Sequence, residues 1–355
     1  MTRLEECANK VERVRAVLRE KGLDGVIIKK QPNFSWITAG ARGFIGLASE
    51  VSCGSIVVTT KDVYIASNNI ETPRLLAEEL PHGFAEPVML PWEEDGGTDA
   101  LLRQKLGKLA DDGELDAWFR QERVNLLGSE VERYASAGET VAEILENVCL
   151  SVKPGVSELE IAGMISSGLW AAGIEPITML VAADERSKHF RHYVPTSGKV
   201  TRGVICSLCA RAGGLVISAT RSVAFDKDFA QRYEALLQVE NVAFTATTQG
   251  ARLGEVLGKI KDAYNQNGLD GEYKNHHQGG LTGYLAREVR VDSTCQKVAQ
   301  PNQAFAWNPS AVGAKCEDTV LLQEDGIRVL TPCSAKWPTV QVGKLLRPDV
   351  LRKQY

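Results

Sequence analysis

The stretch from His276 to Glu288 holds the residues whose types and spacing are most typical of a ligand site. It begins with two adjacent histidines, continues through glycines, and ends with an Arg-Glu pair. Imidazole titrates near neutral pH and also binds metals, so the histidine pair predicts either proton transfer or metal coordination. The glycines predict a tight turn or a close approach of strands, and they leave space beside the backbone.

Further polar residues suited to such a site are His192, Arg221 and Glu317. Several of the candidate residues also have a structural alternative. His192 follows a charged loop, where it would simply be solvated, and one of His276 and His277 would hydrogen-bond the backbone of the glycine turn. The Arg287-Glu288 pair would be a surface ion pair of little energetic weight.

Cys206 and Cys209 form a Cys-x-x-Cys pair, a spacing that often indicates zinc. The pair lies within an apolar run that predicts a strand, and residues three apart in a strand point to opposite faces. We therefore expect buried free thiols. The eight cysteines are scattered, which favours a reducing compartment.

Composition limits the class of protein. A chain of 355 residues with 44% hydrophobic and 24% charged residues is typical of a globular protein with two domains. The net charge of −4 argues against a nucleic-acid partner. No apolar run has the length of a membrane span and no signal peptide is evident, so we expect a cytoplasmic protein without a membrane partner.

The first part of the chain predicts an α/β domain. Apolar residues at helical spacing from Leu4 to Leu18 predict a helix that ends at Gly22. Short apolar runs follow at 26–28 and 35–38, a strand-turn-strand unit at 55–66, and a second helix at 100–109. The domain boundary is expected near residues 113–128.

The second part predicts helices and strands in alternation. A helix at 131–150 is followed by Ser157 and Glu160, which form a capping box for a helix that ends at Gly173. The other expected elements are strands at 177–181, 204–210, 214–218, 303–307 and 318–322, and helices at 228–248 and 253–266. Trp307 is expected in the core.

The ordered set of these segments resembles the creatinase/prolidase/methionine-aminopeptidase superfamily, an M24-like group with the pita-bread fold. The segments that carry this resemblance are Lys153-Pro154-Gly155, the helix from Ser157 to Gly173, His192 to Thr196, Thr220-Arg221-Ser222, the His276 stretch and Glu317-Asp318-Thr319. It implies a creatinase-like mixed α/β domain at 1–120 and, at 121–355, a pita-bread domain with an antiparallel sheet flanked by helices.

In active metallopeptidases of this superfamily, two Asp, one His and two Glu hold a pair of divalent metals, which need such donors to offset their charge. The resemblance puts these five ligands at Ser207, Ser218, Gly280, Asn308 and Glu317 of this sequence. Only Glu317 keeps an acidic side chain. We therefore expect no dinuclear site and no cofactor, and we interpret Gly280 as a vacant ligand position.

The resemblance implies catalytic roles for His192 and His276 as proton-transfer groups and for Glu317 as a carboxylate. Without a metal, Glu317 needs a cationic partner, hydrogen-bond donors or a raised pKa, and Arg221 is a candidate partner. Arg287 stands where a catalytic histidine is usual. The expected substrate-binding residues are Arg221, His277, Tyr284, Arg287 and Asn308.

Creatinase hydrolyses a C–N bond without a metal, so the resemblance implies a metal-independent hydrolase acting on a small amino-acid-like substrate. Two alternatives stay open: a catalytically dead protein that binds a peptide or metabolite, and a metallopeptidase of Xaa-Pro type. The expected partners are a small molecule or short peptide and, by resemblance, a second copy in a homodimer.

Overall fold

The computed structural model describes residues 1–354, and Tyr355, the last residue of the second predicted domain, lies outside the described part. The chain divides into two compact units, one of residues 1–123 with 213–215, and one of residues 124–212 with the chain from 216 onward. The division falls three residues beyond the expected domain end at 120. That the two units are separate domains stays a prediction.

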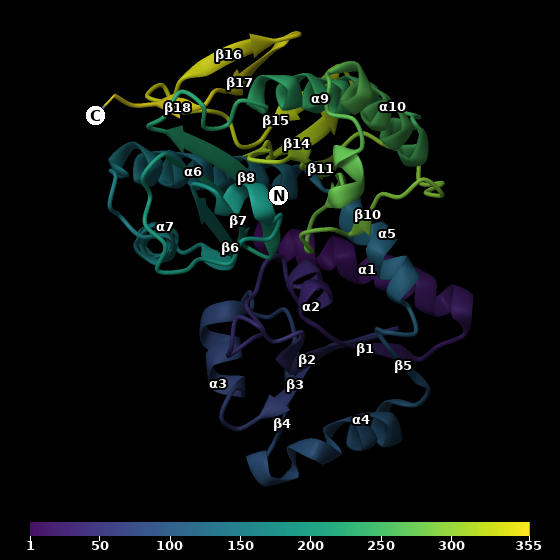
Figure 1. Cartoon of the computed structure of the whole chain (residues 1–355). Helices are drawn as coiled ribbons and strands as arrows, with labels where there is room; N and C mark the ends of the chain where they lie inside the picture. Colours follow the sequence, from purple (N-terminus) through teal and green to yellow (C-terminus); the bar gives the residue numbers. More distant parts are fainter. Residues whose placement is uncertain (355) are drawn as a thin grey trace. The chain divides into compact units, whose positions relative to one another are not determined.

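The first unit is built on a five-stranded mixed sheet with the order β4-β3-β2-β1-β5 (Figure 1). Helix α1 (Arg3–Lys21) begins with a capping box from Thr2 and Glu5 and ends at Gly22, whose φ of 60° is left-handed, so the predicted helix is confirmed. The strands are β1 (Gly25–Lys30), β2 (Val51–Thr59), β3 (Val63–Asn68), β4 (Glu86–Leu90) and β5 (Leu109–Asp111).

Two short segments of this unit differ from a simple hydrophobic pattern. Most of the apolar run at 35–38 lies in helix α2 (Gln31–Ile37), because Pro32 in the first turn has the φ that starts a helix. Helix α4 (Thr98–Leu106) ends earlier than expected, at Gly107 with φ 88°, and Leu109 begins β5. The remaining helical segments are α3 (Thr72–Arg74), η1 (Leu75–Glu79), η2 (Trp92–Gly97) and α5 (Asp116–Val124).

The second unit contains a large sheet with the order β10-β9-β11-β14-β8-β7-β6, in which β15 also pairs with β14 and β18 with β8. The pairs with a described register are antiparallel, as predicted, except for the short parallel pair of β18 with β8. Its strands are β6 (Glu175–Ala183), β7 (Gly203–Ala212), β8 (Leu215–Ala224), β9 (Gly279–Thr282), β10 (Val289–Arg290), β11 (Gln303–Trp307), β14 (Asp318–Gln323), β15 (Gly326–Val329) and β18 (Leu351–Arg352). Two small hairpins add β12 (Ser310–Ala311) with β13 (Ala314–Lys315), and β16 (Thr339–Val342) with β17 (Leu345–Pro348).

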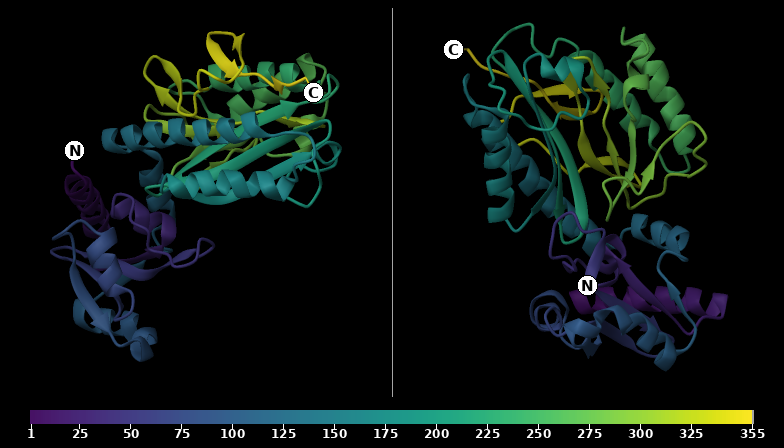
Figure 2. Two further views of the ribbon diagram at one scale, coloured as in Figure 1. Left: turned by 90° about the vertical axis from the view of Figure 1, so that its left-hand side faces the viewer. Right: turned by 60° about the horizontal axis from the view of Figure 1, so that its bottom comes forward.

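Helices cover both sides of this sheet (Figure 2). Helices α6 (Gly128–Ser151) and α7 (Glu158–Ala171) pack on β7 and β6, and α7 begins with the predicted capping box of Ser157 and Glu160. Helices α9 (Tyr233–Ala246) and α10 (Leu253–Gln266) pack on the other side, near β11. The expected antiparallel sheet flanked by helices is confirmed. Within residues 1–354, no helix combines the length and the hydropathy that a membrane crossing requires.

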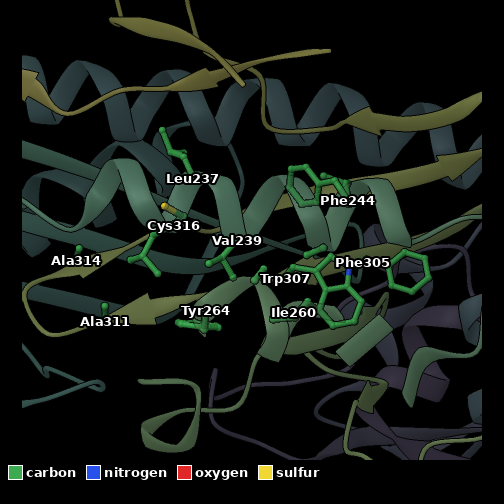
Figure 3. Packing of buried hydrophobic residues seen from close by; sticks show 14 of the residues in the cluster. Leu237, Val239, Phe244, Ile260, Tyr264, Phe305, Trp307, Ala311, Ala314 and Cys316 are labelled. Atoms are coloured by element: carbon green, nitrogen blue, oxygen red, sulfur yellow. The ribbon is translucent and has the colours of Figure 1, made fainter. Parts of the chain in front are cut away.

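The main core of this unit lies between α9, α10 and β11 (Figure 3). Phe305 and Trp307 are two residues apart on β11 and so share one face, where their rings stack at 6.0 Å. Trp307 is fully buried and its indole N–H donates to Thr247 Oγ1 at 3.1 Å. The predicted core position of Trp307 is confirmed.

Candidate active site

A cavity of about 170 Å³ in the second unit contains many of the predicted site residues. One wall is formed by β6 and β7, where Leu180 pairs with Ser207 and Thr178 pairs with Cys209. These residues alternate along their strands and therefore face the same side. The other lining residues are His192, Leu208, His277, Ala286, Arg287, Asn308, Lys315 and Glu317.

Glu317 is held in this cavity by two cations, and we call Arg287, Lys315 and Glu317 the cavity cluster. Lys315 Nζ lies 2.8 Å from Glu317 Oε2, and Arg287 donates to Glu317 Oε1 at 2.7 Å. Burial alone would raise the pKa of Glu317, but the two cations outweigh it and lower this pKa to about 2. The carboxylate therefore stays ionised and is a weak base near neutral pH.

The cationic partners of Glu317 differ from the expected one. The sequence suggested Arg221, whereas the structure pairs Glu317 with Arg287 and Lys315. The interpretation of Arg287 and Glu288 as a surface ion pair is also wrong, because Glu288 accepts from the backbone of Tyr284 and Leu285 instead.

Lys315 was missed as a site residue, although the sequence carries a signal for it. It lies two positions before Glu317, at the end of β13, and residues two apart in an extended chain share a face. A lysine at that spacing from a buried glutamate is a candidate ion-pair partner.

His192, His276 and His277 form a second group, which we call the histidine cluster. His192 Nε2 lies 3.1 Å from His276 Nε2, so the N–H of one ring donates a hydrogen bond to the nitrogen of the other. The rings of His276 and His277 stack with centroids 4.3 Å apart. Side chains of adjacent residues in an extended chain normally diverge, but these two rings lie together. Among the described residues, neither ring bonds the backbone of the glycine turn.

The histidine cluster is biased towards neutral imidazoles. Burial, assisted by the positive charge of Lys315, lowers the pKa of His276 to about 3. Burial and Arg287 lower the pKa of His277 to about 4. The pKa of His192 is also lowered by burial and by Lys315, but His192 is the most exposed of the three. It is therefore the ring best suited to accept a proton from a bound water.

Several polar atoms around the cavity have no hydrogen-bond partner within residues 1–354. They include Arg287 Nε, a donor, and Asn308 Oδ1, an acceptor, both of them buried. Most buried polar groups in proteins are hydrogen-bonded, so unsatisfied ones at a cavity indicate where a ligand or water would bind. A free donor on a cation and a free amide oxygen together suit a zwitterionic ligand.

Arg221 does not line the cavity. Its guanidinium is fully buried and bonds Glu146 at 2.8 Å and Asp318 at 3.0 Å. Arg347 bonds the same Asp318 and also Glu240. We call Glu146, Arg221, Glu240, Asp318 and Arg347 the interior network. Because its donors are occupied there, Arg221 is unavailable to a ligand, and its predicted substrate-binding role is not supported.

Tyr284 also lies outside the cavity lining. Its side chain is 3% exposed, and its hydroxyl donates to Glu130 of helix α6. This contact connects the segment after β9 to α6, so Tyr284 has a structural role in place of the expected contact with substrate.

Gly280 does not mark an empty space. A Cβ built there would lie 2.0 Å from the carbonyl oxygen of Val289 on the neighbouring strand, and the φ of Gly280 is +145°. Few residues other than glycine adopt such a backbone conformation. The interpretation of Gly280 as a vacancy for a metal-binding side chain is therefore wrong, because β10 occupies that space.

The residues at the five ligand positions do not fit a pair of divalent ions. Ser207 Oγ is hydrogen-bonded to Thr220 Oγ1 at 2.7 Å, and Ser218 Oγ lies 3.3 Å from Cys209 Sγ. Gly280 offers no donor, and both oxygens of Glu317 contact cations. A two-metal centre needs several anionic oxygens free to bridge the ions, and these positions lack them.

The Cys-x-x-Cys pair lies on β7 as free thiols. The thiol of Cys206 is hydrogen-bonded to the thiol of Cys149 on helix α6, whereas Cys209 lines the cavity beside Ser218. The two side chains point to opposite faces of the sheet, as the spacing on a strand predicts, so they are not placed to bind one ion together.

A larger cavity of about 330 Å³ lies elsewhere on this unit, near α8 (Arg186–His189). Its charged residues pair with one another, since Glu185 bonds both Lys188 and Arg202 at 2.9 Å. Paired surface charges indicate a solvated surface, and we place the candidate site at the smaller cavity instead.

The sequence of this chain is similar to proteins that are named as peptidases. The profile of metallopeptidase family M24 matches residues 132–324. The probable dipeptidase PepE of Mycobacterium tuberculosis (strain ATCC 25618 / H37Rv) is 24% identical over 227 residues, which cover 61% of this chain and 60% of that protein. The match thus spans less than two thirds of that relative. The uncharacterized peptidase YqhT of Bacillus subtilis (strain 168) is 22% identical over 352 residues, or 91% of this chain and 97% of that protein.

Solved structures agree in fold. The prolidase from Pyrococcus horikoshii OT3 has a TM-score of 0.76 at 19% identity, covering 92% of this chain and 99% of that one. The dipeptidase PepE from Mycobacterium ulcerans has a TM-score of 0.75 at 18% identity, covering 99% of both chains. The sheet, its flanking helices and the sequence match lead to one conclusion: the chain belongs to metallopeptidase family M24.

Proposed function

We propose that this protein hydrolyses a C–N bond in a short peptide or a peptide-like small molecule bound beside the cavity cluster. The observation that carries the proposal is the set of unsatisfied polar atoms, Arg287 Nε and Asn308 Oδ1, around a cavity in an M24 fold. Its volume of about 170 Å³ is below the ~300–1,000 Å³ of common ligand pockets, which favours a small substrate.

The residues of the cavity divide the task in this proposal. Arg287 binds a substrate carboxylate, and Asn308 accepts from a substrate N–H group. His192 takes a proton from water as the water oxygen bonds to the carbonyl carbon, and His276 accepts or returns that proton across their 3.1 Å contact. The C–N bond then breaks and the leaving nitrogen is protonated. Glu317 keeps Arg287 and Lys315 in place.

The relatives support a peptidase of the Xaa-Pro or dipeptidase kind better than a creatinase-like enzyme, because they are named as dipeptidases or prolidases. They do not support metal independence, which stays a prediction. The side chains at the five ligand positions argue only against a centre with two metal ions, and they leave other kinds of metal site open. A catalytically dead binding protein is the second candidate, since the ion pairs of Glu317 would allow a zwitterion to bind without reaction.

The test is a panel of dipeptides, with and without proline in the second position, and creatine, analysed by mass spectrometry for cleavage. Each assay is run with added Zn²⁺ or Mn²⁺ and with a chelator. We expect cleavage of at least one dipeptide, and loss of turnover with retained fold in His192→Ala.

His189→Ala, which changes an exposed histidine on α8, is the matched control and should keep full activity. Unchanged turnover in His192→Ala would remove this mechanism. Ligands that raise the melting temperature but are never converted would instead favour the binding protein.

A further inference from the structure

Three of the five histidines of the chain gather in the histidine cluster. His192 comes from the loop after α8, and His276 and His277 come from the segment between η3 (Glu272–Asn275) and β9. One ring nitrogen from each residue lies within 4.8 Å of the other two. The fold thus brings together three imidazole rings that could bind a metal ion, from segments 84 residues apart in the sequence.

The spacing of these nitrogens is close to that of a coordination site. Zinc binds imidazole nitrogen at ~2.0–2.1 Å in tetrahedral geometry, which separates two such nitrogens by about 3.3 Å. The Nε2 atoms of His192 and His276 are 3.1 Å apart. A modest rotation of the third ring would bring its nitrogen from within 4.8 Å to the same separation.

Two ring nitrogens of the cluster also lack partners. Nδ1 of His276 and Nδ1 of His277 are buried and have no hydrogen-bond partner among the residues that the structure describes. An ion or an ordered water at Nδ1 of His277 would satisfy that atom, whereas Nδ1 of His276 would carry the ring proton when its Nε2, which faces His192, binds an ion.

We propose that His192, His276 and His277 form a mononuclear site for a transition-metal ion of the zinc type. Three imidazoles without a carboxylate suit Zn²⁺, Co²⁺, Ni²⁺ or Cu²⁺, whereas Mn²⁺ and Mg²⁺ prefer oxygen donors. Three protein ligands leave a fourth position for water or an anion. The site uses none of the five positions at which the sequence resemblance puts the ligands of a metal pair.

The surrounding charges set the expected strength of binding. Arg287 and Lys315 exceed Glu317 by one positive charge, and this charge opposes a cation nearby. We therefore expect weaker binding than at a site with carboxylate ligands, and tighter binding when an anion such as acetate occupies the fourth position. A bound ion takes the place of the hydrogen bond between His192 and His276, so proton transfer between these rings and metal binding exclude each other.

The proposed metal site does not depend on whether the cavity hydrolyses a peptide.

The test is metal binding by the full chain without substrate. Protein treated with chelator is titrated with Zn²⁺ by calorimetry, and with Co²⁺, whose visible absorption reports tetrahedral coordination. We expect one ion per chain, little binding of Mn²⁺, and a strong Co²⁺ absorption band. His277→Ala and His192→Ala should each weaken Zn²⁺ binding by more than the ~10–100-fold lost with an outer-shell partner.

His189→Ala is the control and should bind Zn²⁺ like the wild type, and circular dichroism checks that each variant is folded. The proposal is overturned if the wild type binds no Zn²⁺, or if folded His192→Ala and His277→Ala bind it unchanged. Two ions per chain that are lost in Glu317→Gln would also overturn it, in favour of a metal pair at the positions of the family.

Discussion

Two consecutive acidic residues of the second unit belong to two different buried ion clusters, one at the cavity and one in the interior. Glu317 belongs to the cavity cluster with Arg287 and Lys315, whereas Asp318, the first residue of β14, belongs to the interior network with Arg221 and Arg347. Neighbouring residues of an extended chain point to opposite sides. This short segment therefore supplies one carboxylate, that of Glu317, to the candidate site and another, that of Asp318, to the core.

The two clusters differ in how completely their polar atoms are bonded. In the interior network, Arg221 donates to Glu146, Asp318 and two backbone carbonyls. Glu240 Oε1 has no partner in the described chain, and burial raises the pKa of Glu240, which favours its protonated form. Around the cavity cluster, a cationic N–H and an amide oxygen lack partners. A buried charge thus indicates a ligand site when unsatisfied atoms and a cavity accompany it.

The largest effect should come from Arg221→Met. The side chain of Arg221 is fully buried, and its loss leaves Glu146 and Asp318 short of positive charge in the interior. Breaking a buried ion pair by removing one partner lowers the free energy of unfolding by about 3–5 kcal/mol. Urea denaturation of the wild type and the variant, followed by circular dichroism, measures this change.

Arg202→Met is the matched control in the same unit. Arg202 bonds Asp226 at 2.7 Å but is 39% exposed, and exposed pairs contribute only ~0–1 kcal/mol. Equal losses in the two variants would contradict a structural role specific to the interior network.

A smaller effect on stability is expected from Glu317→Gln. It leaves Arg287 and Lys315 without their counter-charge, at a loss of about 1–3 kcal/mol in the free energy of unfolding. Because Arg287 and Lys315 line the cavity, inorganic phosphate should replace the lost negative charge and restore part of this loss, measured as a rise in melting temperature. Asp318→Asn, which changes an acid of the interior network, should show no such rescue. Equal responses of both variants to phosphate would remove the distinction between the clusters.

Much of the fold could be predicted from the sequence because its signals are local. The helix that ends at Gly22 and the helix capped by Ser157 and Glu160 follow from residue types at fixed spacing. The antiparallel sheet was expected from resemblance. The run at 35–38 shows the limit of hydrophobic pattern, since Pro32 in the first helical turn decided its conformation.

The site was predictable only in part, because side-chain partners depend on contacts between distant segments. His192, His277, Arg287, Asn308 and Glu317 were expected at one site and do line one cavity, although their roles stay proposals. Sequence could not show that Arg221 turns towards Glu146. Nor could it show that the strand after Gly280 fills the space beside that glycine, since no local pattern encodes a neighbouring carbonyl.

The smallest effect should be a loss of stability in mild acid that depends on the histidine cluster. The folded-state pKa values of His276 and His277, about 3 and 4, lie below the ordinary 6.5. Their contribution to stability is therefore complete above pH 6.5 and is lost as pH falls towards the folded values, because the unfolded chain binds protons first. Each ring gives at most ~1.4 kcal/mol per pH unit, and partial exposure reduces the expected total between pH 7.5 and 5.0 to about 1–2 kcal/mol.

Urea denaturation of chelator-treated protein at both pH values measures the loss, and the double variant His276→Asn/His277→Asn should show less of it. The contribution of Glu317 enters only below its ordinary pKa of 4.5, outside this range. An equal loss in the double variant would show that groups other than these two histidines cause it.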